Sequence, residues 1–253
     1  PPMNSPLVGI PLAAVGEVSK GFLKERNLET LGCVSHPSHL FCFEWAREHI
    51  GSYGNPARQQ LEMVLISVLI GFAVAFALAL LAHRFRYLEP PLLAGTGILF
   101  AIPSVAFFLL LLPITGRGRE TAIIALSAYT LQIIYRNVMV GLHNVPESAK
   151  DAARGTGLTE RQILWKVEIP LAIPEIIAGL RVAVVSTMAI ATLAVFVHAG
   201  GLGEKIYGSG NLNFPTTIII AGVIAIVMAL LLDAVLLLIQ RAATPWRRAE
   251  ALA

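Results

Sequence analysis

Five stretches of the sequence, each about as long as a membrane-crossing helix, carry almost no charge, and this feature limits the fold more than any other. They cover roughly residues 61–82, 91–114, 121–142, 173–197 and 216–239. Such a length is needed to cross a bilayer, where each unpaired charge or backbone group costs several kcal/mol. Only 14% of the 253 residues are charged, which is too few for a soluble surface. We therefore expect an all-α integral membrane protein with about five transmembrane helices.

Basic residues fix the expected orientation and the division of the chain. One side of the membrane receives Arg84, Arg86, Lys150, Arg154, Arg161, Lys166, Arg241, Arg247 and Arg248. The loops on the other side carry only Arg117, Arg119 and Lys205. Because basic loops stay in the cytoplasm, we expect 1–60 to be an extracytoplasmic segment, 61–240 the transmembrane domain with a cytoplasmic loop at 143–170, and 241–253 a cytoplasmic tail. The chain begins at Pro1, so its apolar run at 7–15 is either the remnant of a longer, sixth segment or an interfacial stretch.

Four polar or proline residues within the spans are candidate functional positions. Pro103, followed by Ser104, removes a backbone hydrogen bond in the second span, so we expect a kink that either lines a translocation pathway or serves helix packing alone. Arg181 and Asp233 lie at depths of about 12 Å and about 9 Å from the same face. They either form an intramembrane ion pair, or Arg181 reaches the headgroups while Asp233 binds backbone or water.

The cytoplasmic loop at 143–170 has the pattern of a helix, a glycine turn and a second helix. Asn144 and the following Pro146 are typical of a helix start, and Gly155 and Gly157 supply the backbone freedom that ends the first helix.

The second helix of the loop has its own start and stop signals. Thr159 and Gln162 form a capping box, and the helix is expected to run over 160–167 and to stop before Pro170. Ala152 and Ala153 form a small, smooth face on the first helix. The apolar face of the second part consists of Leu158, Ile163, Leu164 and Trp165. Such faces predict a partner protein, whereas a hairpin that stabilises the bundle is the alternative.

The spacing within this loop resembles the EAA signature of ABC-importer permeases. The pattern is Asp151-Ala152-Ala153, three residues, Gly157, nine residues, and then Val167, Glu168, Ile169 and Pro170. The family has Glu-Ala-Ala, three residues, Gly, nine residues and Ile-x-Leu-Pro, so Asp151, Val167 and Ile169 are conservative departures. Gly200-Gly201-Leu202-Gly203 and Ile102-Pro103-Ser104 resemble the branch that imports glycine betaine, choline, carnitine or proline. The likeness covers roughly 61–246.

This resemblance implies a permease subunit in the cell membrane of a prokaryote. The implied ATPase-coupling residues are Asp151, Ala152, Ala153, Gly157, Val167, Ile169 and Pro170. A separate ATPase would bind ATP and Mg, because the chain has no GxxxxGK[ST] phosphate loop and needs no cofactor of its own. The other implied partners are a second permease, with a heterodimer favoured over a homodimer, and an extracytoplasmic solute-binding protein. Membrane lipid surrounds the assembly, and no nucleic-acid partner is expected.

Two other classes and one cysteine-histidine run compete with this interpretation. An ion-coupled secondary transporter or channel needs carboxylates or unwound helices near the midplane, and Asp233 is not placed there. A membrane enzyme needs a catalytic constellation, and the six histidines are scattered. The run at 33–42 leaves a zinc site, a disulfide or no special role open, and no metal is expected elsewhere. Its members are Cys33, His36, His39 and Cys42.

Overall fold

The computed structural model describes residues 41–208 and 215–244, and all regular structure in these two ranges is helical. The elements are α3 (Phe43–His49), η1 (Ile50–Tyr53), α4 (Gly54–Arg84), η2 (Arg86–Leu88), α5 (Glu89–Ala101), α6 (Ser104–Thr115), α7 (Arg119–His143), α8 (Glu147–Gly155), α9 (Glu160–Ile163), η3 (Leu164–Glu168), α10 (Ile169–Ala191), η4 (Thr192–Val197), α11 (Leu202–Gly208) and α12 (Pro215–Ala243). The predicted all-α class is confirmed.

Four helical segments of the described residues are long and apolar enough to cross a membrane, and a bent pair brings the total to five. The four are Phe43–Arg84, Arg119–His143, Glu160–Val197 and Pro215–Ala243. The first crossing helix, α4, begins at Gly54, a few residues before the predicted boundary between 60 and 61, which stays a prediction. Pro56 lies in the first turn of α4, where its missing N–H costs no helical hydrogen bond, and the helix therefore includes the polar turn before the apolar run.

The bent pair replaces the single kinked helix predicted for 91–114. Helices α5 and α6 meet at 97°, with Ile102 and Pro103 in extended conformation between them. Pro103 cannot donate a backbone hydrogen bond, and the chain therefore breaks there rather than bending within one helix. The Tyr129 hydroxyl of α7 donates a hydrogen bond to the Ile102 carbonyl, which the break leaves without a helical partner. Pro103 thus redirects the chain.

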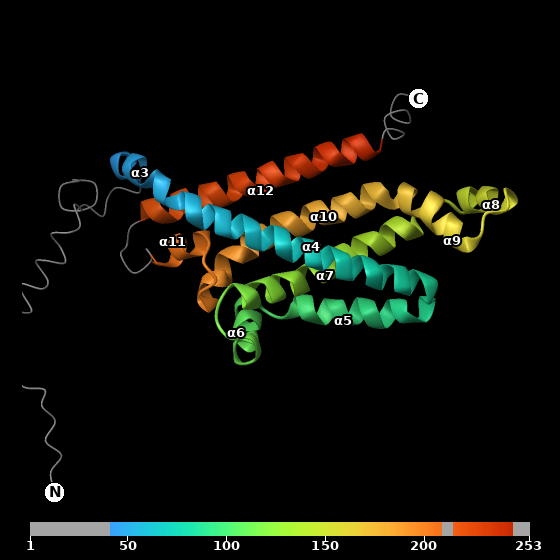
Figure 1. Ribbon diagram of the computed structural model, residues 1–253, viewed down its shortest axis with the longest axis horizontal. Helices are drawn as coiled ribbons and strands as arrows, with labels where there is room; N and C mark the ends of the chain where they lie inside the picture. The colour runs from blue at the N-terminus through green and yellow to red at the C-terminus, as the bar shows by residue number, and fades with distance from the viewer. Residues whose placement is uncertain (1–40, 209–214, 245–253) are drawn as a thin grey trace, which may run out of the picture.

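Helices α4, α7 and α10 pack along one another in the centre, with α12 beside α10 and α5 beside α7 (Figure 1). Small residues allow this close approach. A Cβ atom on Gly71 would lie 1.6 Å from the Thr130 hydroxyl oxygen, and one on Gly179 would lie 2.3 Å from the Asn137 Cβ. These glycines therefore set the spacing of α4 and α10 against α7.

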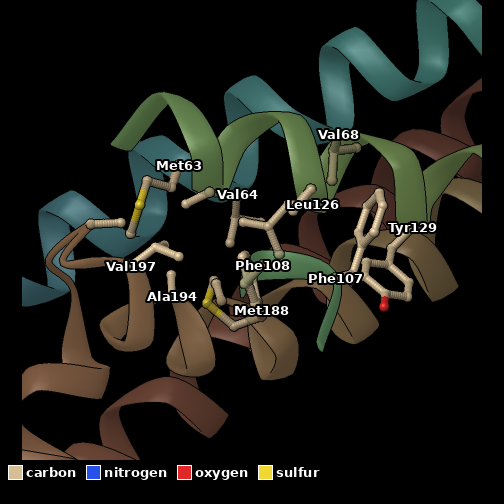
Figure 2. Close-up of a cluster of buried hydrophobic side chains, with 14 of the residues drawn as sticks. Met63, Val64, Val68, Phe107, Phe108, Leu126, Tyr129, Met188, Ala194 and Val197 are labelled. Carbon is tan, nitrogen blue, oxygen red and sulfur yellow. The ribbon is translucent and has the colours of Figure 1, made fainter. Parts of the chain in front are cut away.

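A buried apolar cluster joins α4, α6, α7, α10, η4 and α12 at the end of the bundle opposite α8. Figure 2 shows Met63, Val64 and Val68 of α4, Phe107 and Phe108 of α6, Leu126 and Tyr129 of α7, Met188 of α10, and Ala194 and Val197 of η4. The rings of Phe107 and Tyr129 meet edge to face with centroids 5.6 Å apart. Because α6 turns away from α5, its two phenylalanines fill the space between the central helices.

The glycine turn at 200–203 binds the start of α4. Gly200 and Gly201 have φ angles of 85° and 89°, which favour glycine. The backbone N–H groups of Gly201 and Leu202 donate to the Gln59 and Gln60 side-chain oxygens at 3.1 Å and 2.9 Å. The Gln60 amide is buried and also donates to the Met188 carbonyl at 3.2 Å. This turn therefore has a structural role in holding the chain between α10 and α12.

Candidate functional site

The loop between α7 and α10 lies at one end of the helices, with α8 and α9 beyond the ends of α4, α5 and α7 (Figure 1). We call this the α8 end. Helix α8 begins at Glu147 with Pro146 as its N-cap, whereas Asn144 is the C-cap of α7. The predicted helix start at Asn144 was therefore wrong, because Asn144 ends α7 instead of starting α8. Pro146 prevents α7 from continuing, and its fixed φ angle favours the start of α8.

The predicted glycine turn after α8 is confirmed at Gly157. Its φ angle is 82°, and nothing lies within 4 Å of the place where a Cβ would stand. The N–H groups of Gly157 and Leu158 donate to the Arg154 and Ala153 carbonyls at 2.9 Å and 3.3 Å. These bonds satisfy carbonyl groups at the end of α8, so the turn needs glycine for its backbone conformation rather than for space.

The capping box is confirmed, but the helix after it does not stop before Pro170. The Thr159 N–H donates to the Gln162 side-chain oxygen at 2.9 Å. Helix α9 then continues through a π-helical turn at Leu164–Glu168 directly into α10. Pro170 lacks the N–H that would bond to the Lys166 carbonyl, and its ring would crowd that carbonyl in a regular α-helix. The wider π-turn accommodates the proline, so one helical segment runs from the loop into the membrane.

The structure divides the predicted coupling residues by exposure. Asp151, Ala152 and Gly157 are exposed, Val167, Ile169 and Pro170 are half-buried, and Ala153 is buried. Ala152 and Ala153 therefore do not form one exposed face, because neighbours on a helix point about 100° apart. The predicted apolar face also separates: Ile163 is buried, whereas Trp165 is 58% exposed. The surface available to a partner is thus Ala152, the glycine turn and Trp165.

Arg154 links both parts of this loop on its outer surface. Its guanidinium lies 3.1 Å from the Glu147 carboxylate, 2.9 Å from Asp151 and 3.2 Å from Glu160. Hydrogen bonds from Arg154, and then from Lys150, lower the pKa of Glu147. The hydrogen bonds to the three carboxylates, Glu147 foremost, raise the pKa of Arg154. The charges of α8 therefore compensate one another, and Arg154 connects α8 to the start of α9.

A buried carboxylate that sequence reasoning missed connects the loop to the first crossing helix. Glu168 is 6% exposed. Its Oε2 lies 2.7 Å from Nε2 of His83 near the end of α4, without an aligned hydrogen bond, and its Oε1 lies 3.8 Å from the Lys150 ammonium of α8. We call these three residues the Glu168 cluster. Their only sequence signal is an acidic residue beside an apolar span, and nothing in the sequence gives its partners.

The two intramembrane charges that the sequence paired lie in contact. Nε and Nη2 of Arg181 on α10 donate to Oδ1 and Oδ2 of Asp233 on α12 at 2.7 Å and 2.8 Å. Gln240 accepts a further bond from Arg181 at 3.4 Å and donates to the Pro174 carbonyl at 2.8 Å. A bidentate pair of this kind satisfies both charges within the chain, so headgroup contact is not required.

The structure tests only part of the remaining predictions, which concern the translocation pathway and the cysteine-histidine run. Ser104 begins α6 and is half-buried, and Pro103 is exposed at the bend. Their place in a translocation pathway stays a prediction. Cys33, His36 and His39 lie outside the described residues. In the ranges 41–208 and 215–244, no three metal-binding side chains lie close enough to hold an ion.

Comparison with known proteins gives consistent matches. The family described as "Binding-protein-dependent transport system inner membrane component" matches residues 63–249. The glycine betaine/carnitine/choline transport system permease protein OpuCD of Bacillus subtilis (strain 168) is 35% identical over 187 residues, which cover 74% of this chain and 82% of that protein. The osmoprotectant import permease protein OsmW of Salmonella typhimurium is 34% identical over 193 residues, covering 74% and 89% of the two chains.

Solved structures share the fold at lower identity. An inward-facing structure of the MetNI methionine ABC transporter superposes with a TM-score of 0.68 at 23% identity, over 76% of this chain and 96% of that chain. An amino acid ABC transporter crystallised with histidines gives a TM-score of 0.68 at 19% identity, over 79% and 98% of the two chains. The arrangement of crossing helices is therefore shared with membrane subunits of known transporters.

Proposed function

The chain belongs to the family of binding-protein-dependent transport system inner membrane components, and on that premise we propose that it imports osmoprotectants such as glycine betaine, choline, carnitine or proline. It is a multi-pass membrane permease subunit of an ABC importer. The solute class is supported by the transport functions of relatives at 34–35% identity that match along 74% of the chain. Because the chain belongs to this family, we prefer the permease function to the alternatives of an ion-coupled transporter and a membrane enzyme.

The coupling mechanism rests on one observation. The exposed loop that consists of α8, the glycine turn and α9 is continuous with α10. A separate ATPase, with its ATP and Mg, binds this loop at Asp151, Ala152 and Gly157. Ala153 lies beneath this surface and supports it. Because α9, η3 and α10 form one unbroken helical segment from Glu160 to Ala191, displacement of the loop moves α10 within the membrane. Val167, Ile169 and Pro170 transmit this movement.

The assembly contains further subunits. The described residues contain four to five crossing helices, which are too few to enclose a solute pathway, so a second permease completes it, and a heterodimer is favoured over a homodimer. An extracytoplasmic binding protein delivers the solute to the end opposite α8. Pro103 and Ser104, at the bend between α5 and α6, line the pathway. The chain itself uses no cofactor.

Uptake by the complete transporter tests this function. The chain is produced with its ATPase, second permease and binding protein in cells that lack osmoprotectant uptake, and labelled glycine betaine and choline are supplied. We expect accumulation that requires all four components and stops when the ATPase cannot hydrolyse ATP. An ATPase variant that binds but does not cleave ATP is the matched control. Uptake by this chain alone, driven by an ion gradient, would overturn the proposal.

A further inference from the structure

Helices α5 and α7 border a cleft of about 380 Å³ at the α8 end, separate from the coupling loop. It is lined by Glu89, Leu93, Gln132, Tyr135, Arg136, Met139, Val140 and His143. Glu89 is the first residue of α5, and His143 is the last of α7. Arg136 precedes His143 by seven residues, a depth of about 10 Å along the helix. The cleft therefore reaches from the helix ends into the membrane-crossing part, and its volume is that of a small-molecule site.

Arg136 forms no ion pair within the described part of the chain. Its side chain is exposed and makes no ion pair or hydrogen bond with residues of 41–208 or 215–244. A charge at this depth is strongly unfavourable against hydrocarbon, and such residues face a water-filled cavity or an opposite charge. Arg136 lies in the wall of the cleft, so the cleft is the place where its partner would bind.

Gln132 adds a second donor beside Arg136. The two residues are four positions apart on α7 and therefore lie on one face of the helix. The Thr96 hydroxyl of α5 donates to the Gln132 side-chain oxygen, which fixes the amide. Its NH₂ group makes no hydrogen bond among the described residues and is left to donate. A guanidinium and an amide NH₂ on one face suit a carboxylate ligand.

Glu89 gives the same cleft a negative charge at its other end. Its side chain is 30% exposed, and its Oε2 lies 3.5 Å from Nε2 of His143. The buried Tyr135 hydroxyl donates to the Glu89 carbonyl at 3.4 Å, which holds the start of α5 against α7. The lining therefore presents donors for an anionic group and a carboxylate for a cationic group within one small volume.

We propose that this cleft binds the transported solute as a zwitterion, with its carboxylate on Arg136 and Gln132 and its cationic group toward Glu89. The inference rests on the proposed function and narrows it, because it assigns the carboxylate-bearing members of the osmoprotectant class to a site on this chain. The site lies at the α8 end, so it holds the solute late in its passage. Choline, which has a quaternary ammonium group but no carboxylate, makes only the Glu89 interaction.

Paired uptake measurements on the complete transporter test the site. The transporter is reconstituted in liposomes, and uptake of glycine betaine and choline is measured beside the ATPase activity stimulated by the loaded binding protein. Arg136→Gln should lower glycine betaine uptake at least about tenfold, since a hydrogen bond to a charged group is lost, and choline uptake less than about twofold. Glu89→Gln should lower uptake of both solutes. Arg117→Gln, the same change at an exposed position outside the spans, is the matched control.

The outcomes separate this inference from the proposed function. Equal loss of both solutes in Arg136→Gln, or unchanged glycine betaine uptake, overturns the zwitterion site while leaving the function intact. Wild-type uptake of neither solute overturns the function and the site together. Retained ATPase stimulation shows that a variant assembles. If Arg136→Gln does not assemble, Arg136→Lys is measured instead; it keeps the charge and should retain part of the glycine betaine uptake. Liposomes without anionic lipid should give the same selectivity, and a change there assigns Arg136 to headgroups instead.

Discussion

The α10–α12 contact and the α5–α7 cleft each contain an arginine of a membrane-crossing helix, and the two charges have opposite surroundings. Arg181 forms a bidentate pair with Asp233. Arg136 forms no ion pair among the described residues of its own chain. The first charge is therefore compensated within the fold, where it joins two helices, and the second is available to another molecule. The comparison indicates that the position of a counter-charge, rather than the arginine itself, separates structural from functional charges.

The largest expected effect comes from breaking the compensated pair. Asp233→Leu leaves the Arg181 charge without its partner and should lower the free energy of unfolding by about 3–5 kcal/mol. Arg181→Leu combined with Asp233→Leu removes both charges and should be less damaging than Asp233→Leu alone. Thermal unfolding of the detergent-solubilised chain, together with the amount of inserted protein, measures the difference.

Exchanging the two residues is the control for this prediction. The double variant Arg181→Asp with Asp233→Arg keeps both charges at the contact between α10 and α12 and should recover part of the lost stability. A double Leu variant that is less stable than Asp233→Leu would contradict the view that the lone charge is the source of the loss.

The Glu168 cluster extends the comparison to the ends of the helices. Glu168→Ala removes the carboxylate between His83 and Lys150. Of the ion pairs that the largely buried Lys150 ammonium, 11% exposed, forms with described residues, only that with Glu147 is left. We expect a loss of about 1–3 kcal/mol in the free energy of unfolding, smaller than for Asp233→Leu because Lys150 keeps the Glu147 carboxylate at 3.3 Å. Glu168→Gln keeps the shape and isolates the charge effect. Equal stability of wild type and Glu168→Ala would show that the loop is held by apolar packing alone.

Sequence patterns predicted the features that depend on near neighbours along the chain. The capping box at Thr159, the turn at Gly157 and the spans follow from local spacing, and each is present. The pairing of Arg181 with Asp233 was one of two alternatives that the sequence left open, because residue counts place both at similar depths on their spans; the structure shows the pair. These features need no knowledge of which helices touch.

Features that depend on helix neighbours or on unusual helix geometry could not be predicted. The passage of the helix through Pro170 depends on a π-turn, which has no distinct sequence signature. The 97° break at Pro103 depends on Tyr129 and the space beside α7. The partners of Glu168 come from α4 and α8, and only the folded chain brings them together. The cleft at Arg136 likewise exists only once α5 packs on α7.

The glycine turn of the loop offers a smaller effect that separates docking from folding. Gly157 has a φ angle of 82°, a conformation that Asn and Asp tolerate better than other side chains. Gly157→Asp should therefore lower stability by less than about 1 kcal/mol, yet weaken ATPase binding about tenfold by placing a charge in the docking surface. Gly157→Asn has the same shape without the charge and is the control. Co-purification of the ATPase and solute-stimulated ATP hydrolysis are measured, and normal coupling in Gly157→Asp would contradict the docking role.

The smallest expected effect concerns the arginine without a partner. Arg136→Gln removes a charge that makes no ion pair or hydrogen bond within the described chain, so no partner is left uncompensated. The free energy of unfolding of the isolated chain should therefore change by less than about 0.5 kcal/mol, as for exposed substitutions. Arg181→Gln is the matched variant: the same change should cost several kcal/mol, because Asp233 is left alone. Both are measured by thermal unfolding of the detergent-solubilised chain. Similar losses in the two variants would mean that Arg136 also stabilises the fold, and the distinction between a structural and an available intramembrane charge would then fail.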